Sequence, residues 1–86
     1  MNFIKEENRI YCLDDNQKKV AQITFEEIEK GIFNINHTFV DESLRGQGIA
    51  SKLVQEAIKE IENRNGSVQA TCSYAKKWLE KNYRNK

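Results

Sequence analysis

Apolar and polar residues alternate most clearly over residues 32–40, and this pattern predicts a β-strand. The alternation assigns two sets of side chains to opposite faces of that strand. One face takes Phe33, Ile35, His37 and Phe39, and the other takes Asn34, Asn36 and Thr38. Residues 9–13 and 18–25 predict two earlier strands, separated by a polar turn at residues 14–17.

Residues 26–30 are acidic and fit two structures. They either extend the strand before them or form a wide turn that ends at Gly31. The pattern alone does not choose between these two.

A helical pattern begins after residue 48, where apolar residues recur every three or four positions. Its apolar side consists of Ile49, Leu53, Val54, Ala57, Ile58 and Ile61. This spacing predicts an amphipathic helix of about four to five turns. Asn65 and Gly66 end it, and we expect Gly66 to take the left-handed conformation that often follows a helix.

Residues 67–72 predict a short strand, and Ser73 is placed to cap a final helix. A strand, a helix and a second strand in sequence imply a right-handed crossover between parallel strands. The predicted fold class is therefore α+β with a mixed sheet. Three antiparallel strands lead into a strand–helix–strand crossover and a C-terminal helix, and residues 1–86 form one domain.

Composition narrows the range of partners. Charged residues make up 31% of the chain, yet its net charge is only +1. A dedicated nucleic-acid binder would carry a basic surface, so we expect no nucleic-acid partner. The longest apolar run is too short to cross a bilayer, and the first residues do not resemble a signal peptide. We therefore expect a cytoplasmic protein with no membrane partner.

The two cysteines, Cys12 and Cys72, match no zinc-ligand spacing, and the single histidine does not complete such a site. We expect no metal. Two free thiols in a reducing cytoplasm are the simpler arrangement, and a disulfide between them is the alternative.

The turn before the long helix carries the clearest chemical signal. Gly46 and Gly48 stand where a strand gives way to a helix, and Arg45 precedes them. Unpaired amides at a helix start attract anions, glycines let a bulky anion approach, and arginine binds phosphate. This arrangement predicts a pyrophosphate ligand. The alternative is that the glycines only allow a tight, closely packed turn.

The segment Leu44-Arg45-Gly46-Gln47-Gly48-Ile49-Ala50 closely resembles the acetyl-CoA signature of the Gcn5-related N-acetyltransferases, Gln/Arg-x-x-Gly-x-Gly/Ala. Arg45, Gly48 and Ala50 stand at its three defined positions. The resemblance covers roughly residues 10–83. Within that family, the chain is similar to a small single-domain subgroup that shares His37-Thr38-Phe39-Val40, the signature turn, Cys72-x-Tyr74 and Trp78. It implies a minimal acyl-CoA N-acyltransferase fold.

The same resemblance implies acetyl-CoA as the co-substrate. The residues that it assigns to the coenzyme are Phe39, Val40, Arg45, Gly46, Gln47, Gly48, Ile49, Ala50, Ser51 and Lys77. Typical family members are nearly twice as long and carry helices that help form the acceptor site. The acceptor is therefore unknown. Three arrangements of the acceptor site remain open: an open surface, a site completed by the partner in a weak homodimer, or a monomer that has no acceptor site.

Three residues are candidates for the chemistry. The resemblance implies that Tyr74 is a general acid. Cys72 could accept the acetyl group after activation by His37, or His37 could act directly as the base. The alternatives are a part-buried histidine, a small core cysteine and a core tyrosine, and Trp78 is also expected to be a core residue.

Three functions remain open at this point. The first is an acetyltransferase that modifies an unidentified acceptor, most simply an amine. The second is a coenzyme A-binding or sensing module without turnover, and the third is an interaction domain whose glycines serve packing alone.

Overall fold

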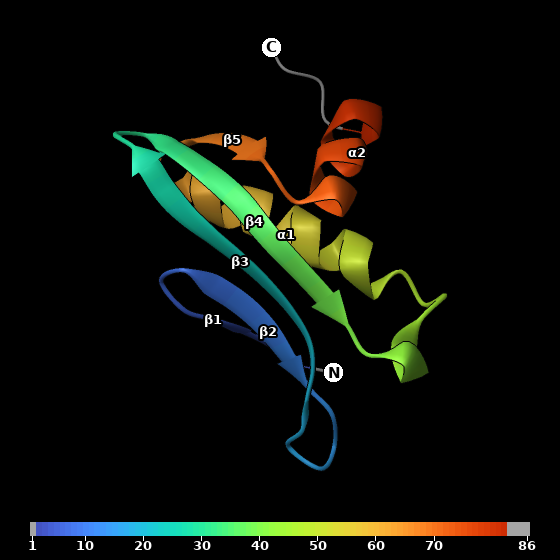
Figure 1. The fold of residues 1–86 in the computed structure, drawn as a ribbon. Helices are drawn as coiled ribbons and strands as arrows, with labels where there is room; N and C mark the ends of the chain where they lie inside the picture. The colour runs from blue at the N-terminus through green and yellow to red at the C-terminus, as the bar shows by residue number, and fades with distance from the viewer. Residues whose placement is uncertain (1, 83–86) are drawn as a thin grey trace.

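The computed structural model describes residues 2–82, which fold into one sheet and two long helices (Figure 1). The elements in chain order are β1 (Asn2–Lys5), β2 (Arg9–Leu13), β3 (Lys19–Glu29), β4 (Ile32–Val40), the 3-10 helix η1 (Glu42–Leu44), α1 (Ile49–Asn63), β5 (Ser67–Ala70) and α2 (Ser73–Asn82). The strands lie side by side in the order β1-β2-β3-β4-β5.

The sheet is mixed, which confirms the predicted α+β class. Strands β1 to β4 run antiparallel, and β5 pairs parallel to β4 after the α1 crossover. The structure adds β1, which the sequence pattern did not reveal. That strand has only four residues, and its ends Asn2 and Lys5 are exposed, so it shows too little alternation to be recognised.

Helix α1 covers one face of the sheet, and the core lies between them (Figure 1). The apolar positions predicted for this helix are all buried in that core, because they form one continuous stripe along it. Helix α2 contributes Ala75 to the same core, with Trp78 and Leu79 packed against it. The molecule therefore has two layers and measures 17 Å along its shortest axis.

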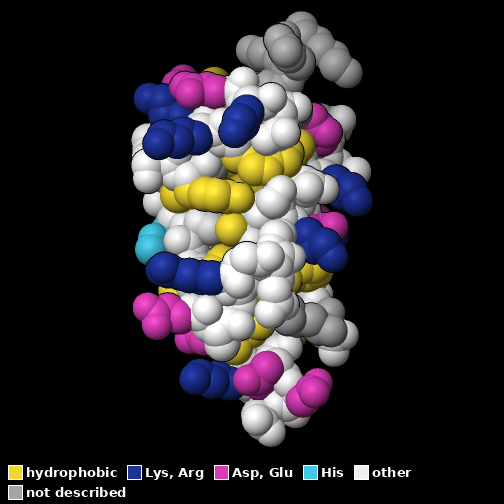
Figure 2. All heavy atoms as spheres, turned by 90° about the vertical axis from the view of Figure 1, so that its right-hand side faces the viewer, with side chains coloured by type: hydrophobic (Ala, Val, Ile, Leu, Met, Phe, Trp, Pro, Cys, Tyr) yellow, Lys and Arg dark blue, Asp and Glu magenta, His cyan; other side chains and the backbone are white. Residues whose placement is uncertain are grey.

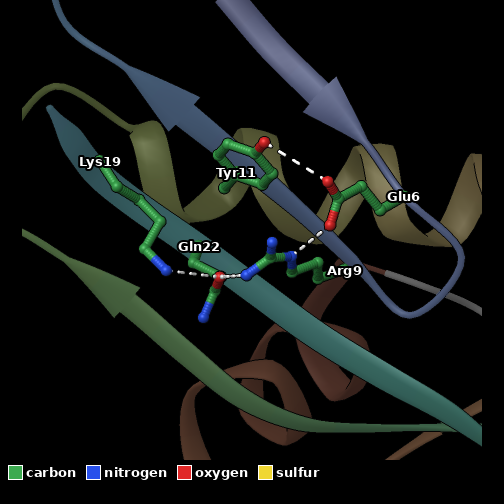
Figure 3. Close-up of polar contacts among 5 residues, drawn as sticks. All are labelled: Glu6, Arg9, Tyr11, Lys19 and Gln22. Atoms are coloured by element: carbon green, nitrogen blue, oxygen red, sulfur yellow. Dashed lines mark hydrogen bonds and ion pairs between the residues drawn. The ribbon is translucent and has the colours of Figure 1, made fainter. Parts of the chain in front are cut away.

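The opposite face of the sheet is polar. Arg9 donates to Glu6 and, over 3.2 Å, to Gln22, which also accepts from Lys19 at 3.1 Å (Figure 3). The Arg9 guanidinium lies 4.8 Å from the centre of the Tyr11 ring. These side chains suit a face that meets water rather than another layer of the protein.

A β-bulge in β4 changes which side chains face α1. Thr24 of β3 stands opposite His37, but the next residue, Phe25, stands opposite Ile35, so Asn36 is an extra residue in β4. A one-residue insertion reverses the facing of every position beyond it. Phe33 and Ile35 share one face, as predicted, and that face meets the core, whereas the assignment of His37 and Phe39 to the same face is wrong.

Beyond the bulge, Thr38 and Val40 point toward α1 instead. Their β3 neighbours Ile23 and Ala21 are fully buried on that side. His37 is exposed on the polar face, and Phe39 retains 40% of its exposure there.

Strands β4 and β5 separate soon after they pair. Their register ends at Ile35 opposite Ala70, and the amides of Thr71 and Cys72 both donate to the Ile35 carbonyl, at 3.0 and 3.2 Å. Strand β4 continues to Val40, while the chain after β5 turns into α2. A wedge therefore opens between the second half of β4 and the start of α2.

Several predicted boundaries shift. The acidic residues 26–30 mostly extend β3, which runs to Glu29, and the last strand ends at Ala70 rather than residue 72. Cys72 occupies the position before α2, where its carbonyl accepts the Lys76 amide at 2.9 Å. Ser73 is thus the first residue of the helix instead of its cap.

The C-terminal end of α1 also differs in detail. Asn65, with a φ of 61°, takes the left-handed conformation that was expected of Gly66. The Gly66 amide donates to Ile61 and the Asn65 amide to Glu62, both over 2.9 Å, and together these bonds satisfy the last carbonyls of the helix. No helix within residues 2–82 is long and apolar enough to cross a membrane.

Candidate functional site

The turn between β4 and α1 has a backbone conformation that leaves space beside the start of the helix. The Asp41 carboxylate caps η1 by accepting from the Ser43 amide at 3.1 Å. Gly46 and Gly48 then take φ values of 84° and 73°, which residues with a Cβ rarely adopt. Gly48 is the residue at the start of α1 and supplies no capping side chain. The first amides of α1 consequently lack the acceptor that a capping Ser or Asp provides.

These amides border a hollow of about 390 Å³, the α1 hollow. Its lining comes from the end of β4, the turn, the first turn of α1 and the start of α2. The residues are Thr38, Val40, Leu44, Arg45, Gly46, Gly48, Ile49, Ala50, Ser51 and Tyr74. A Cβ atom at Gly46 or Gly48 would meet no protein atom within 4 Å, so the space beside both glycines is open.

The charge around the hollow favours an anion. Arg45 is the charged residue of its lining, and the first turn of α1 contains no acidic residue. The positive end of the α1 dipole adds to the Arg45 charge. A phosphate group therefore fits this end of the hollow.

The free edge of β4 forms the other wall. The Asp41 amide donates to the Val20 carbonyl across the β3–β4 ladder at 2.8 Å. Hydrogen-bonded positions alternate along an antiparallel pair, so the peptide groups of Thr38 and Val40 point away from β3. They point to the edge that β5 has left, where an extended ligand can pair with them.

Cys72 lies at the inner end of the wedge. Its thiol donates to the Thr38 hydroxyl at 3.4 Å, and Thr38 in turn lines the α1 hollow. Burial raises the pKa of the Cys72 thiol. In the thiolate form, however, the sulfur accepts hydrogen bonds from the Thr38 hydroxyl and from the backbone at Ala75, Tyr74 and Thr38, and these bonds outweigh burial. The pKa consequently lies below its usual value, as is typical of a cysteine at a helix N-terminus.

A second depression, the α2 groove, adjoins the hollow through two shared residues, Ser51 and Tyr74. It has a volume of about 590 Å³ and is lined by Ser51, Tyr74, Lys77, Trp78, Lys81 and Asn82. Figure 2 shows this side of the molecule, with Lys and Arg side chains gathered near hydrophobic ones at the level of α2. The groove thus continues the positive charge of the hollow along α2.

The structure brings together most of the residues predicted to contact a coenzyme. Those that line the α1 hollow are Val40, Arg45, Gly46, Gly48, Ile49, Ala50 and Ser51. Lys77 lies in the α2 groove, and Tyr74 lines both depressions. Phe39 and Gln47 lie outside both linings, Phe39 because of the bulge.

His37 and Cys72 are not brought together as a pair. His37 is exposed on the polar face, whereas Cys72 bonds to Thr38 on the side that faces α1. The expected pairing assumed unbroken alternation in β4, and the bulge removes that condition. Thr38 takes the place beside the thiol.

Two further features of the site were not predicted from the sequence. Leu44 lines the hollow, and the Trp78 indole donates to the Ser51 hydroxyl at 2.8 Å. This bond joins residues 27 positions apart, so no local pattern could indicate it. Within residues 2–82, no group of three His, Cys, Asp or Glu side chains is arranged to hold a metal ion.

Comparison with known proteins identifies close sequence and fold relationships. The family model described as GCN5-related N-acetyl-transferase matches residues 9–86. The solution structure of a GCN5-like protein from Staphylococcus aureus is 35% identical, covers 93% of this chain and 78% of its own, and superimposes with a TM-score of 0.76.

Two other comparisons are more distant. Protein NATD1 of Gallus gallus is 31% identical over 62 residues, which are 72% of this chain and 56% of that protein. The chain thus spans about half the length of this relative. A ribosomal-protein-alanine N-acetyltransferase from Brucella melitensis shares the fold, with a TM-score of 0.70, 19% identity and coverage of 91% of this chain and 61% of its own.

Proposed function

This chain belongs to the GCN5-related N-acetyltransferase family, and on that premise we propose that it binds acetyl-CoA and transfers the acetyl group to an amine acceptor. The observation that carries the proposal is the α1 hollow. It combines open space beside two glycines, unpaired helix amides, Arg45 and the free edge of β4.

In this proposal the coenzyme extends along the wedge. Its pyrophosphate accepts hydrogen bonds from the first amides of α1 and meets the Arg45 guanidinium. Its pantetheine arm pairs with the Thr38 and Val40 peptide groups, as an added strand would. Lys77 supplies a positive charge to the nucleotide end from the α2 groove.

The acetyl end then lies near Cys72, whose lowered pKa supports a role as acyl acceptor. The thiolate attacks the thioester carbonyl, the bond to the coenzyme sulfur breaks, and the departing thiolate takes a proton. Tyr74, the second residue of α2, lines the hollow and is the proposed donor of that proton. The new thioester on Cys72 is then open to attack by the acceptor amine.

His37 takes a separate role in this scheme. It is exposed on the polar face, beside the stretch of β4 that borders the wedge. We assign it the removal of a proton from an acceptor that approaches from that face. Replacement with alanine should then slow transfer to an amine but leave acetylation of Cys72 unchanged.

A pair of glycine substitutions tests coenzyme binding. Gly48→Ala and Gly31→Ala introduce a Cβ at similar φ values, 73° and 80°, and neither Cβ meets a protein atom within 4 Å. Each should cost a similar backbone strain of about 1–2 kcal/mol. Of these two glycines, only Gly48 lines the hollow, so only Gly48→Ala should weaken acetyl-CoA binding, by tenfold or more in calorimetry.

Amide shifts on titration with acetyl-CoA provide an independent measurement. They should appear in residues 38–51 and around Cys72. Equal affinity of the two glycine variants, or shifts confined to other parts of the chain, would contradict the proposal.

The second candidate function is coenzyme A binding without transfer. It is favoured by the exposure of His37 and Phe39, which shows that no other part of residues 2–82 covers the polar face beside the wedge. An uncovered surface of this kind is compatible with a module that binds coenzyme A but has no binding site for an acceptor. Mass spectrometry after incubation with acetyl-CoA separates the two. An acetyl-sized gain that Cys72→Ser abolishes supports transfer, whereas tight binding without any acetylated product supports the binding module.

A further inference from the structure

The Ser51 hydroxyl lies at the junction of the two depressions. Ser51 is the third residue of α1, is half-buried, and lines both the α1 hollow and the α2 groove. Its oxygen accepts the Trp78 indole N–H at 2.8 Å and the Gln55 side-chain amide at 3.2 Å. Both partners come from outside the signature turn, Trp78 from the other helix.

These two bonds determine what the hydroxyl can still do. A hydroxyl has two acceptor sites and one hydrogen to donate, and an indole N–H can only donate. Both bonds use the oxygen, so neither uses the hydrogen. Ser51 is thereby held as a donor at the wall of the hollow, where the Arg45 guanidinium and the first amides of α1 are also donors.

From this geometry we infer that Trp78 is a positioning residue for coenzyme binding. Its indole N–H, supported by Gln55, fills the acceptor sites of Ser51 and turns the Ser51 hydrogen toward an anionic pyrophosphate oxygen in the hollow. The inference rests on the proposed function, because it requires the coenzyme to occupy the α1 hollow. Trp78 thus contributes through its indole hydrogen bond as well as through its packing against the core.

The same bond links the two helices that flank the wedge. Trp78 lies on α2, which begins directly after Cys72, while Ser51 lies on the turn of α1 that faces the pyrophosphate. A coenzyme held by Ser51 therefore also fixes α2, and with it the thiol, relative to the phosphate-binding turn.

The test compares the protein with Ser51→Ala, Trp78→Phe and the double variant, using two probes. Coenzyme A carries the pyrophosphate, and pantetheine lacks it. Calorimetry and amide-shift titration suit the measurement, because Trp78 is the single tryptophan and fluorescence would be lost. Phenylalanine keeps an aromatic ring at position 78 but removes the N–H donor.

Each single variant should lose coenzyme A affinity on the order of tenfold, the effect of removing a hydrogen bond to a charged group. The double variant should bind no more weakly than Ser51→Ala, because Trp78 acts through that hydroxyl. Pantetheine affinity should stay the same in all four proteins.

Several outcomes would overturn the inference. Trp78→Phe could bind coenzyme A as tightly as the unsubstituted protein, or add its full loss to that of Ser51→Ala. An equal loss for pantetheine would show that Trp78 only packs. If the unsubstituted protein binds no coenzyme A, the proposed function itself fails, and this result is distinct because it appears before any substitution.

Discussion

At the scale of single residues, Cys72 illustrates how position creates reactivity. The thiol stands before the first turn of α2 and beside Thr38, and its environment combines partial burial with hydrogen bonds that favour the charged form. Cys12 has the opposite setting. It is fully buried between the sheet and α1, and burial raises the pKa of its thiol. Only Cys72 is therefore suited to act as a nucleophile.

Thr38→Val tests this difference through pH. The substitution keeps the shape of the side chain but removes the hydroxyl that stabilises the Cys72 thiolate. Since that bond lowers the pKa, its loss should raise the pKa and move the rate profile for alkylation of Cys72 to higher pH. Iodoacetamide kinetics across pH measure the shift. An unchanged profile would mean that the helix amides alone set the thiol pKa.

At the scale of secondary structure, the two ends of α1 differ in how their backbone groups are capped. It begins at a glycine without a capping side chain, where a ligand can take the place of the cap, and it ends in a fully hydrogen-bonded turn around Asn65. Gly66 follows in an ordinary conformation, and its role is close approach. A Cβ there would lie 2.6 Å from the Phe33 ring of β4.

Gly66→Ala should therefore destabilise the fold through overpacking, by about 1–3 kcal/mol. In a domain of this size the melting temperature should fall by at least about 4 °C. Thermal unfolding measures the change, and Phe33→Leu supplies the matched background. With a smaller side chain at position 33, Gly66→Ala should cost clearly less, whereas equal costs in both backgrounds would refute the proposed clash.

At the scale of the whole molecule, the coenzyme would contact several separate segments of the fold at once. The proposed site draws on β4, the turn, α1 and α2, while the thin two-layer domain leaves one face of its sheet to solvent. A folded chain of 86 residues buries a modest core and has a small margin of stability. Binding should consequently contribute a large share of its total stability.

A ligand that binds only the folded state adds about 2.7 kcal/mol at a concentration of 100 times its dissociation constant. Coenzyme A at that concentration should raise the melting temperature by roughly 10–20 °C. Differential scanning calorimetry measures the shift, and Gly48→Ala at the same coenzyme concentration should show a smaller one. A melting temperature that does not respond to coenzyme A would contradict binding in the α1 hollow.

Features that depend on local pattern could be predicted from the order of the amino acids. Apolar spacing located α1, alternation located β4 between residues 32 and 40, and the Arg45 to Ala50 segment identified the turn at the start of α1. These features could be predicted because periodicity, glycine content and helix termini act over a few neighbouring residues. The fold class followed from the order of the elements.

Contacts between side chains from distant segments depend on how the elements pack. The Asn36 bulge depends on how β3 pairs with β4, and it moves His37 away from Cys72 and brings Thr38 beside it. The Trp78–Ser51 bond depends on how α2 packs against α1. One-residue shifts of register and contacts between distant segments leave no local trace in the chain. Local pattern therefore located the glycine-bearing turn before α1, while the packing of distant segments determined what surrounds the thiol.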